Sequence, residues 1–218
     1  MTTANLLRRA AVLAVATLTL GGTSPSWSQT ANQPSILERD ASEQAPSEQK
    51  REILKADFVL ANLASTSPLN LMYVVTEEWA AGNKLKASFW YFIWQIRTEA
   101  WAAGLDDPGF SQFQALINDQ LGRGLNIWIS ADTALLRDTA ERAIGYEAKL
   151  PLWSERPDGL DEAQWAAVVA KARADYADEY HSAFAGISDE DIRAKREEYG
   201  LPVGTPTDQG EALPDDWR

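Results

Sequence analysis

The chain has 218 residues, 32 of them acidic and 20 basic, a formal net charge of −12 and no cysteine. This length suits one domain with a core that needs no cross-links, and the missing cysteine excludes disulfides, thiolate metal ligands and a cysteine nucleophile. A surface this acidic repels phosphate backbones and anionic membranes, which argues against nucleic acid as a partner. It favours a cationic protein as the partner, and the alternative explanation is that the acidity serves only solubility.

Residues 1–28 have the three parts of a secretory signal peptide. Arg8 and Arg9 precede an apolar or small run over 10–20, and a small, polar stretch ends at Ser28, where cleavage is expected. The run is shorter than the roughly 20 apolar residues that span a bilayer. We therefore expect export to the periplasm or beyond, with no stable membrane insertion after cleavage. The exported chain would keep 18 basic and 32 acidic residues, a net charge of −14.

Helical periodicity extends from residue 47 to residue 202, and no segment alternates for long enough to predict a strand. We expect a flexible lead-in over 29–46, a single all-α domain over 47–202 and a disordered acidic tail over 203–218. The domain should hold about seven helices, several of them paired as antiparallel hairpins because their connections are short.

Capping signals mark where these helices begin. Ser67-Pro68 and Asp107-Pro108 each place a capping side chain before a proline, and Asp132 and Ser188 are further caps. Asp161 with Gln164 has the spacing of a capping box, and it opens the longest helix. The helix that begins near residue 108 is expected to pack inward through an apolar stripe made of Phe110, Phe113, Leu116, Ile117 and Leu121.

An aromatic cluster is the most unusual feature of the sequence. Four consecutive aromatic residues, 89–92, point almost all round a helix, so this helix must be buried on most faces or expose aromatic surface. Core packing is one interpretation, and a binding patch of tryptophan and arginine is the alternative. The cluster consists of Trp79, Phe89, Trp90, Tyr91, Phe92, Trp94 and Trp101.

Two polar residues, Gln95 and Arg97, lie within this apolar hairpin. A buried arginine needs a charged partner, and Glu77, Glu78 and Glu99 are the candidates. In the alternative interpretation, Gln95 and Arg97 face a groove and bind a carboxylate or a peptide.

The sequence offers no complete catalytic set, and we expect no metal and no cofactor. His181 is the only histidine, so a cluster of histidine ligands is impossible and a serine–histidine–aspartate triad has little support. Two carboxylates that converge in a cleft could hydrolyse a glycosidic bond, and tryptophans stack on sugars. Acidic pairs also serve as caps, and they occur at Glu77-Glu78, Asp106-Asp107, Asp189-Glu190-Asp191 and Asp215-Asp216.

Two segments resemble degenerate tetratricopeptide units in helix–turn–helix length and in the placing of small residues. In residues 71–101 the small positions are Gly82 and Ala87, and residues 125–151 break near Asp132 and close with a proline. Neither copy holds the full tryptophan, leucine-glycine and tyrosine signature. The resemblance implies stacked helical hairpins, a type of scaffold that holds another protein in its concave face.

The chain also resembles small exported bacterial proteins for which no activity is assigned. The shared features are the aromatic run 89–92 followed by Gln95 and Arg97, and the downstream set Asn126, Trp128 and Asp132. This resemblance implies the fold and the exported location, and no mechanism.

These observations predict an exported, non-enzymatic helical module that binds another protein, such as an adaptor or an inhibitor of a cationic partner. A protein that binds or hydrolyses envelope glycan with paired carboxylates and tryptophans is the alternative. The candidate binding residues are Trp79, Trp90, Trp94, Gln95, Arg97, Trp101, Asn126 and Trp128.

Overall fold

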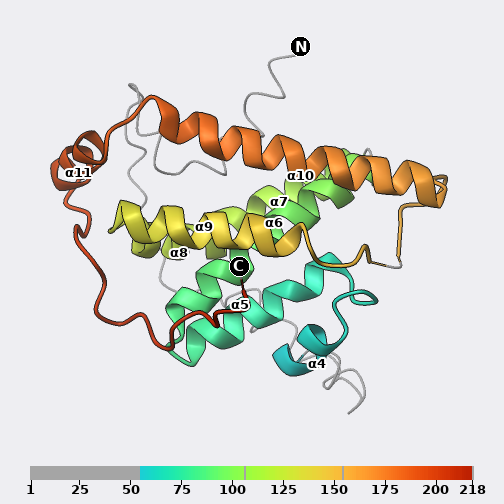
Figure 1. Cartoon of the computed structure of the whole chain (residues 1–218), viewed down its shortest axis with the longest axis horizontal. Helices are drawn as coiled ribbons and strands as arrows, with labels where there is room; N and C mark the ends of the chain where they lie inside the picture. The colour runs from blue at the N-terminus through green and yellow to red at the C-terminus, as the bar shows by residue number, and fades with distance from the viewer. Residues whose placement is uncertain (1–54, 106, 154, 218) are drawn as a thin grey trace, which may run out of the picture.

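The structure is a computed structural model that describes residues 55–105, 107–153 and 155–217 (Figure 1). These residues are helical and contain no strand, which confirms the all-α prediction. The expected signal peptide (1–28) and lead-in (29–46) lie outside the described residues. The elements are α4 (Ala56–Ala61), a 3-10 turn (Pro68–Asn70), α5 (Leu71–Ala80), α6 (Lys84–Leu105), α7 (Pro108–Ile117), a π-turn (Asn118–Gly122), α8 (Arg123–Ile129), α9 (Thr133–Glu147), α10 (Glu162–Ala185) and α11 (Asp189–Glu198).

Four of the five predicted caps make the expected hydrogen bonds, whereas Ser67 makes no side-chain cap bond and precedes the 3-10 turn. Asp107 accepts a hydrogen bond from the N–H of the second residue of α7, and Asp132 accepts two from the first turn of α9. Asp161 and Gln164 form a reciprocal capping box at α10, and Ser188 begins α11 in the same way. Because α7 and α8 are joined by the π-turn, they amount to one interrupted helix, and the described part of the chain holds seven helices on that count.

The central helix of the domain is α6. Helices α5, α9 and α10 pack along it, and α7 and α8 touch it as well. Every residue from Ala87 to Thr98 is therefore buried, which explains how four consecutive aromatic side chains fit on one helix. The aromatic run over 89–92 therefore belongs to the core, which agrees with the core-packing interpretation and not with the binding-patch interpretation.

A tight turn joins α5 to α6 and makes them a helical hairpin. Gly82 in this turn has a φ of +85°, a backbone conformation that glycine adopts without strain. The hairpin is compatible with a tetratricopeptide-like unit, although that finer type stays a prediction.

Helices α9 and α10 lie side by side and run antiparallel across one face of α6 (Figure 1). Side chains join them along their length: Arg173 contacts Glu147, His181 contacts Glu141, and Tyr180 reaches the carbonyl of Arg137. A second, smaller apolar cluster fills the far end of α6 and is made of Ala100, Trp153, Trp165, Val169 and Ala172.

The expectation of a disordered tail over 203–218 is corrected, because residues 203–217 pack on the helices. From α11 the chain runs along one side of the molecule and then crosses the start of α6 (Figure 1). Leu213 is 8% exposed and belongs to the main core, and the Trp217 ring packs on it as well. The composition was misleading because the few apolar residues of this segment find partners that are distant in the sequence.

Hydrogen bonds from Arg196 hold the residues at the start of this segment against α8. Its buried guanidinium donates to the carbonyl of Pro202 at 2.9 Å, to the carbonyl of Ile127 at 2.8 Å and to the hydroxyl of Ser130. The last turn of α8 carries two of these acceptors, so the cation sits at the negative end of that helix. None of the helices in the described part of the chain is long and apolar enough to cross a membrane.

Candidate functional site

Four of the eight candidate binding residues lie inside the core. Trp90, Trp94, Gln95 and Arg97 are each 3% exposed or less, with other helices packed around α6. A partner cannot reach these side chains while the helices and residues 204–217 stay packed over them. The expectation that they line an exposed binding patch is therefore corrected.

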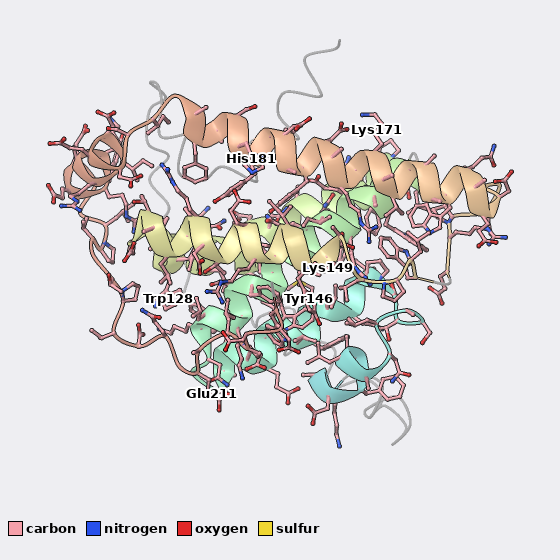
Figure 2. The ribbon with its side chains drawn as sticks, viewed as in Figure 1. Trp128, Tyr146, Lys149, Lys171, His181 and Glu211 are labelled. Carbon is pink, nitrogen blue, oxygen red and sulfur yellow. The ribbon has the colours of Figure 1, made fainter. Side chains whose placement is uncertain are left out.

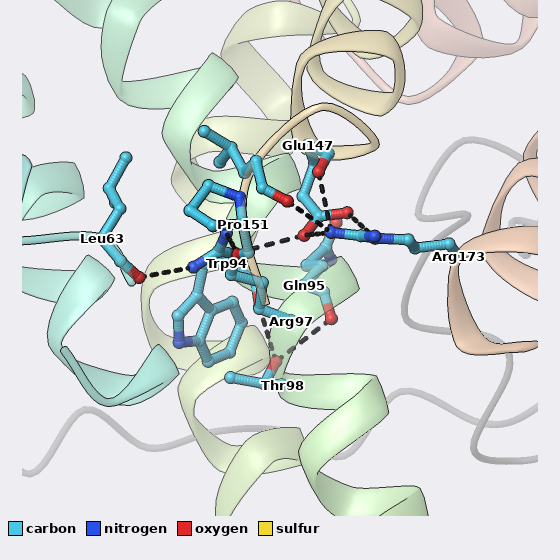
Figure 3. Close-up of polar contacts among 9 residues, drawn as sticks. Leu63, Trp94, Gln95, Arg97, Thr98, Glu147, Pro151 and Arg173 are labelled. Carbon is cyan, nitrogen blue, oxygen red and sulfur yellow. Dashed lines mark hydrogen bonds and ion pairs between the residues drawn. The ribbon is translucent and has the colours of Figure 1, made fainter. Parts of the chain in front are cut away.

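The carboxylate partner of Arg97 is Glu147 on α9 and is not one of the expected glutamates (Figure 3). Arg97 Nε lies 3.2 Å from Glu147 Oε1, and each side chain is 1% exposed. Two of the three expected partners have other roles: Glu77 accepts from the first N–H of α4, and Glu78 accepts from Asn83.

A second arginine completes this buried cluster. Arg173 Nε donates to Glu147 Oε2 at 2.6 Å, and its Nη2 donates to Glu147 Oε1 at 3.0 Å. The remaining N–H groups of Arg97 donate to the carbonyls of Leu63 and Pro151 at 3.0 and 3.3 Å. Burial lowers the pKa of the Arg97 guanidinium, and the charge of Glu147 opposes that shift. The cluster joins four segments of the chain, and its role is structural.

Gln95 is part of a buried polar network. Its Oε1 accepts from Tyr176 Oη at 2.9 Å, and its Nε2 donates to Asn118 Oδ1 at 3.3 Å. The same Asn118 oxygen accepts from Tyr91 Oη at 2.6 Å. Burial raises the pKa of both tyrosines, so the network is neutral and its hydroxyls remain donors. It fixes the π-turn on α6 and provides no general base.

Trp79 and Trp128 come together at the surface, although they are far apart in the sequence. Their ring centroids lie 6.2 Å apart at an interplanar angle of 88°. The ammonium group of Lys84 lies 5.0 Å from the Trp79 centroid and 5.9 Å from that of Trp128. Asp208 pairs with Lys84 and accepts from Trp128 Nε1 at 2.9 Å, and these two partners lower the pKa of its carboxyl. The C-terminal segment thus covers this tryptophan pair.

The last two candidates lie apart from this pair. Asn126 faces the hydroxyl of Tyr91 on the inner side of α8. Trp101 stands edge-on to Trp165, with centroids 5.9 Å apart, at the opposite end of α6. The eight predicted residues therefore form no single site.

A surface feature of α7 was missed by the sequence analysis. None of the residues of α7 is buried. Phe113 and Leu116 are each 44% exposed and face outward, whereas Ile117 of the expected inward stripe packs against the core. The helix also makes a polar inward contact, since Gln114 Nε2 donates to Thr98 Oγ1 at 3.0 Å. We call Phe110, Phe113 and Leu116 the α7 patch. The signal that could have found it is the pair Gln114 and Asn118, which is spaced to meet the polar side chains of α6.

The acidic residues that flank α6 in the sequence do not converge. Glu77-Glu78 lie next to the start of α6, whereas Asp107 follows its end, and 22 helical residues span about 33 Å. Asp106 lies outside the described residues. Over the described ranges, no group of three or more histidine or acidic side chains could hold a metal ion. His181 Nε2 lies 2.9 Å from Glu141 Oε1 at the exposed surface of α9 and α10.

Comparison of the chain with protein-family models, with curated proteins and with solved structures finds no match. Two surface features remain as candidates, the exposed α7 patch and the tryptophan pair beneath the C-terminal segment.

Proposed function

We propose that this protein is an exported, non-enzymatic helical module that binds a cationic protein partner, as an adaptor or an inhibitor. The observation that carries the proposal is the α7 patch. An amphipathic helix that leaves its apolar face uncovered is typical of a protein-binding surface, because isolated domains rarely leave contiguous aromatic side chains in water. The rings of Phe110 and Phe113 lie 6.4 Å apart, so they form one contiguous surface.

The charge of the molecule supports a basic partner. The whole chain has a net charge of −12. Among the described residues, two arginines, Arg97 and Arg196, and one glutamate, Glu147, are buried, so burial removes one more positive than negative charge from their surface. Electrostatic attraction would raise the association rate of a cationic partner and make that rate fall with salt. The expected partner therefore presents apolar side chains to the α7 patch and cationic side chains around them.

The test uses the purified protein as bait in an extract of its own cells at low salt. The variant Phe113→Ser/Leu116→Ser removes the α7 patch. The matched control is Tyr73→Ser/Tyr199→Ser, which removes two exposed aromatic side chains from α5 and from the end of α11. We expect the wild type and the control to capture one basic protein, and we expect salt to release it. The α7 variant should bind this protein at least about tenfold more weakly, as expected when a hot spot is removed.

Two results would contradict the proposal. A captured protein that the α7 variant holds as tightly as the wild type would show that the surface is wrong. An association rate that does not change with salt would show that charge does not select the partner. Circular dichroism of each variant checks that the helices remain.

The glycan alternative has less support in the geometry. Glu77 accepts from the first N–H of α4 and Asp107 caps α7, and the two residues lie near opposite ends of α6. Retaining or inverting hydrolysis needs two carboxyl groups about 5–10 Å apart. Retention of glycan fragments by the bait, abolished by Trp79→Ala, would reverse this preference.

A further inference from the structure

The C-terminal segment lies on the start of α6 as an extended peptide lies on a receptor. We define residues 204–217 as the C-terminal strap. The acceptor surface beneath it consists of Lys84, Lys86, Phe89, Trp90, Trp128 and Tyr146. We propose that the acceptor surface is a peptide-binding site for an extended acidic segment that carries a tryptophan, and that the C-terminal strap is the ligand that occupies it within the same chain.

Backbone contacts fix the middle of the strap. The carbonyl of Gln209 accepts from the Leu85 N–H at 3.0 Å, which satisfies one of the free amides at the start of α6. The N–H of Glu211 donates to Asn83 Oδ1 at 3.2 Å. Between them, Gly210 has a φ of +76°, and a Cβ there would lie 2.5 Å from the Asn83 Cα. The strap therefore approaches the α5–α6 turn backbone to backbone, at a distance that only glycine allows.

Charge complementarity selects an acidic segment. Lys84 and Lys86 stand in the first turn of α6, the positive end of the helix dipole, where cations are unfavourable. Asp208 pairs with Lys84, and Glu211 pairs with Lys86. On a protein with a net charge of −12, this acceptor surface is thus a local cationic site for carboxylates.

An aromatic anchor lies near the end of the strap. The Trp217 ring stacks on Phe89, with centroids 4.8 Å apart at an angle of 20°. It meets Trp90 edge-on at 5.1 Å and Tyr146 at 6.0 Å, and Figure 2 shows Tyr146 beside the end of the chain and Glu211 at the outer bend of the strap. A partly buried tryptophan of this kind is a typical hot spot of a peptide interface.

The strap contains no helix, and the two residues that precede Gly204 in the chain are exposed. Val203 is exposed, and the last firm attachment before the strap is the bond from Arg196 to the carbonyl of Pro202. A tether of this kind gives the strap an effective concentration of roughly millimolar, which excludes a free peptide of the same chemistry. The inference is independent of the α7 patch and of the proposed cationic partner.

The experiment cleaves the folded full chain. A protease recognition sequence is inserted between Pro202 and Val203, the protein is purified and then cut, and a labelled peptide of residues 203–218 is added. We expect the cut protein to retain its own strap in gel filtration and to exchange it for the labelled peptide. The uncut protein should bind the labelled peptide roughly tenfold more weakly or worse. The Trp217→Ala peptide should compete at least about tenfold less well.

A charge swap is the matched control for the pairing. The Glu211→Lys peptide should bind the cut wild-type protein severalfold more weakly than the wild-type peptide does. The cut Lys86→Glu protein should restore the binding of the Glu211→Lys peptide, because the ion pair is then present with its charges exchanged. Two results would overturn the proposal. One is a cut protein that loses its helices when the strap leaves, since the acceptor surface would then not exist without the strap. The other is a cut protein that stays folded but does not exchange its strap or bind the labelled peptide.

Discussion

Arg97 and Glu147 form a buried ion pair, with Nε 3.2 Å from Oε1, although the two residues are 50 positions apart in the sequence. Arg173 binds the other oxygen of the same carboxylate. Glu147 therefore stands between two cations, and the three residues tie α6, α9 and α10 together.

The first prediction concerns that carboxylate. Glu147→Gln leaves two arginines facing each other without an anion and should lower the free energy of unfolding by about 3–5 kcal/mol. Urea unfolding followed by tryptophan fluorescence measures the change. Glu141→Gln, which alters the exposed pair with His181, should change stability by less than about 0.5 kcal/mol. Equal effects of the two substitutions would refute the buried-cluster argument.

The second prediction concerns the π-turn. A Cβ at Gly122 would lie 1.9 Å from the hydroxyl of Tyr91, which the bond to Asn118 holds in place. We expect Gly122→Ala to cost about 1–3 kcal/mol through overpacking. Gly124, two residues on, has no atom within 4 Å of its Cβ position, so Gly124→Ala should be neutral or stabilising by up to about 1 kcal/mol. Thermal unfolding of the two variants makes the comparison, and a stable Gly122→Ala protein would contradict it.

The third prediction is a pH dependence at Asp132. The Thr205 hydroxyl, followed by the backbone N–H groups of Leu135 and Ala134, lowers the pKa of this carboxyl from 3.8. A lowered pKa in the folded state means that the stabilisation is complete above the unfolded value and is lost as the pH falls through the folded value.

Asp132→Ala should therefore cost about 0.5–2 kcal/mol near neutral pH, and the difference from the wild type should shrink below pH 3.8. Thr205→Val removes the first of these donors and should weaken the acid dependence while the cap remains. Denaturant titrations over a pH series provide the measurement. A difference that stays constant down to the lowest pH would show that the charge has no part in it.

The fourth prediction concerns local stability. Since no residue of α7 is buried, whereas every residue over 87–98 of α6 is, α7 should open more readily than α6. Hydrogen exchange followed by mass spectrometry should show amides of 108–117 exchanging on the order of tenfold faster or more than those of 87–98. Equal protection would mean that the two helices open as one unit.

The sequence predicts what is local and fails where partners are distant. Asp132, Asp161 and Gln164 cap helices because their hydrogen bonds reach two or three residues along the chain. Glu147 could not be chosen as the partner of Arg97, because nothing within one helix points to a carboxylate on another. Trp217 was assigned to a tail for the same reason, since its ring contacts are all on α6 and α9.

The candidate site shows the same limit. Periodicity identified the apolar stripe of the helix that begins at Pro108, but the direction in which the stripe faces depends on its neighbours. Gln114 and Asn118 bind polar side chains of α6, and this turns Phe113 and Leu116 away from the core. Periodicity fixes which side chains share a face, and packing decides whether that face meets protein or water.

The π-turn over Asn118–Gly122 gives the chain a place where one residue can be gained or lost without changing which side chains face outward. Such a turn holds one residue more than a regular α-helical turn, and its wider winding absorbs the phase of about 100° that the extra residue would add. Loss of a single residue there would allow one unbroken α-helix from Pro108 to Ile129 in which Phe113 and Leu116 keep their phase relative to α8. A deletion of one codon at this turn would thus leave the α7 patch in place, whereas the same deletion within α8 would rotate one part of the helix against the other.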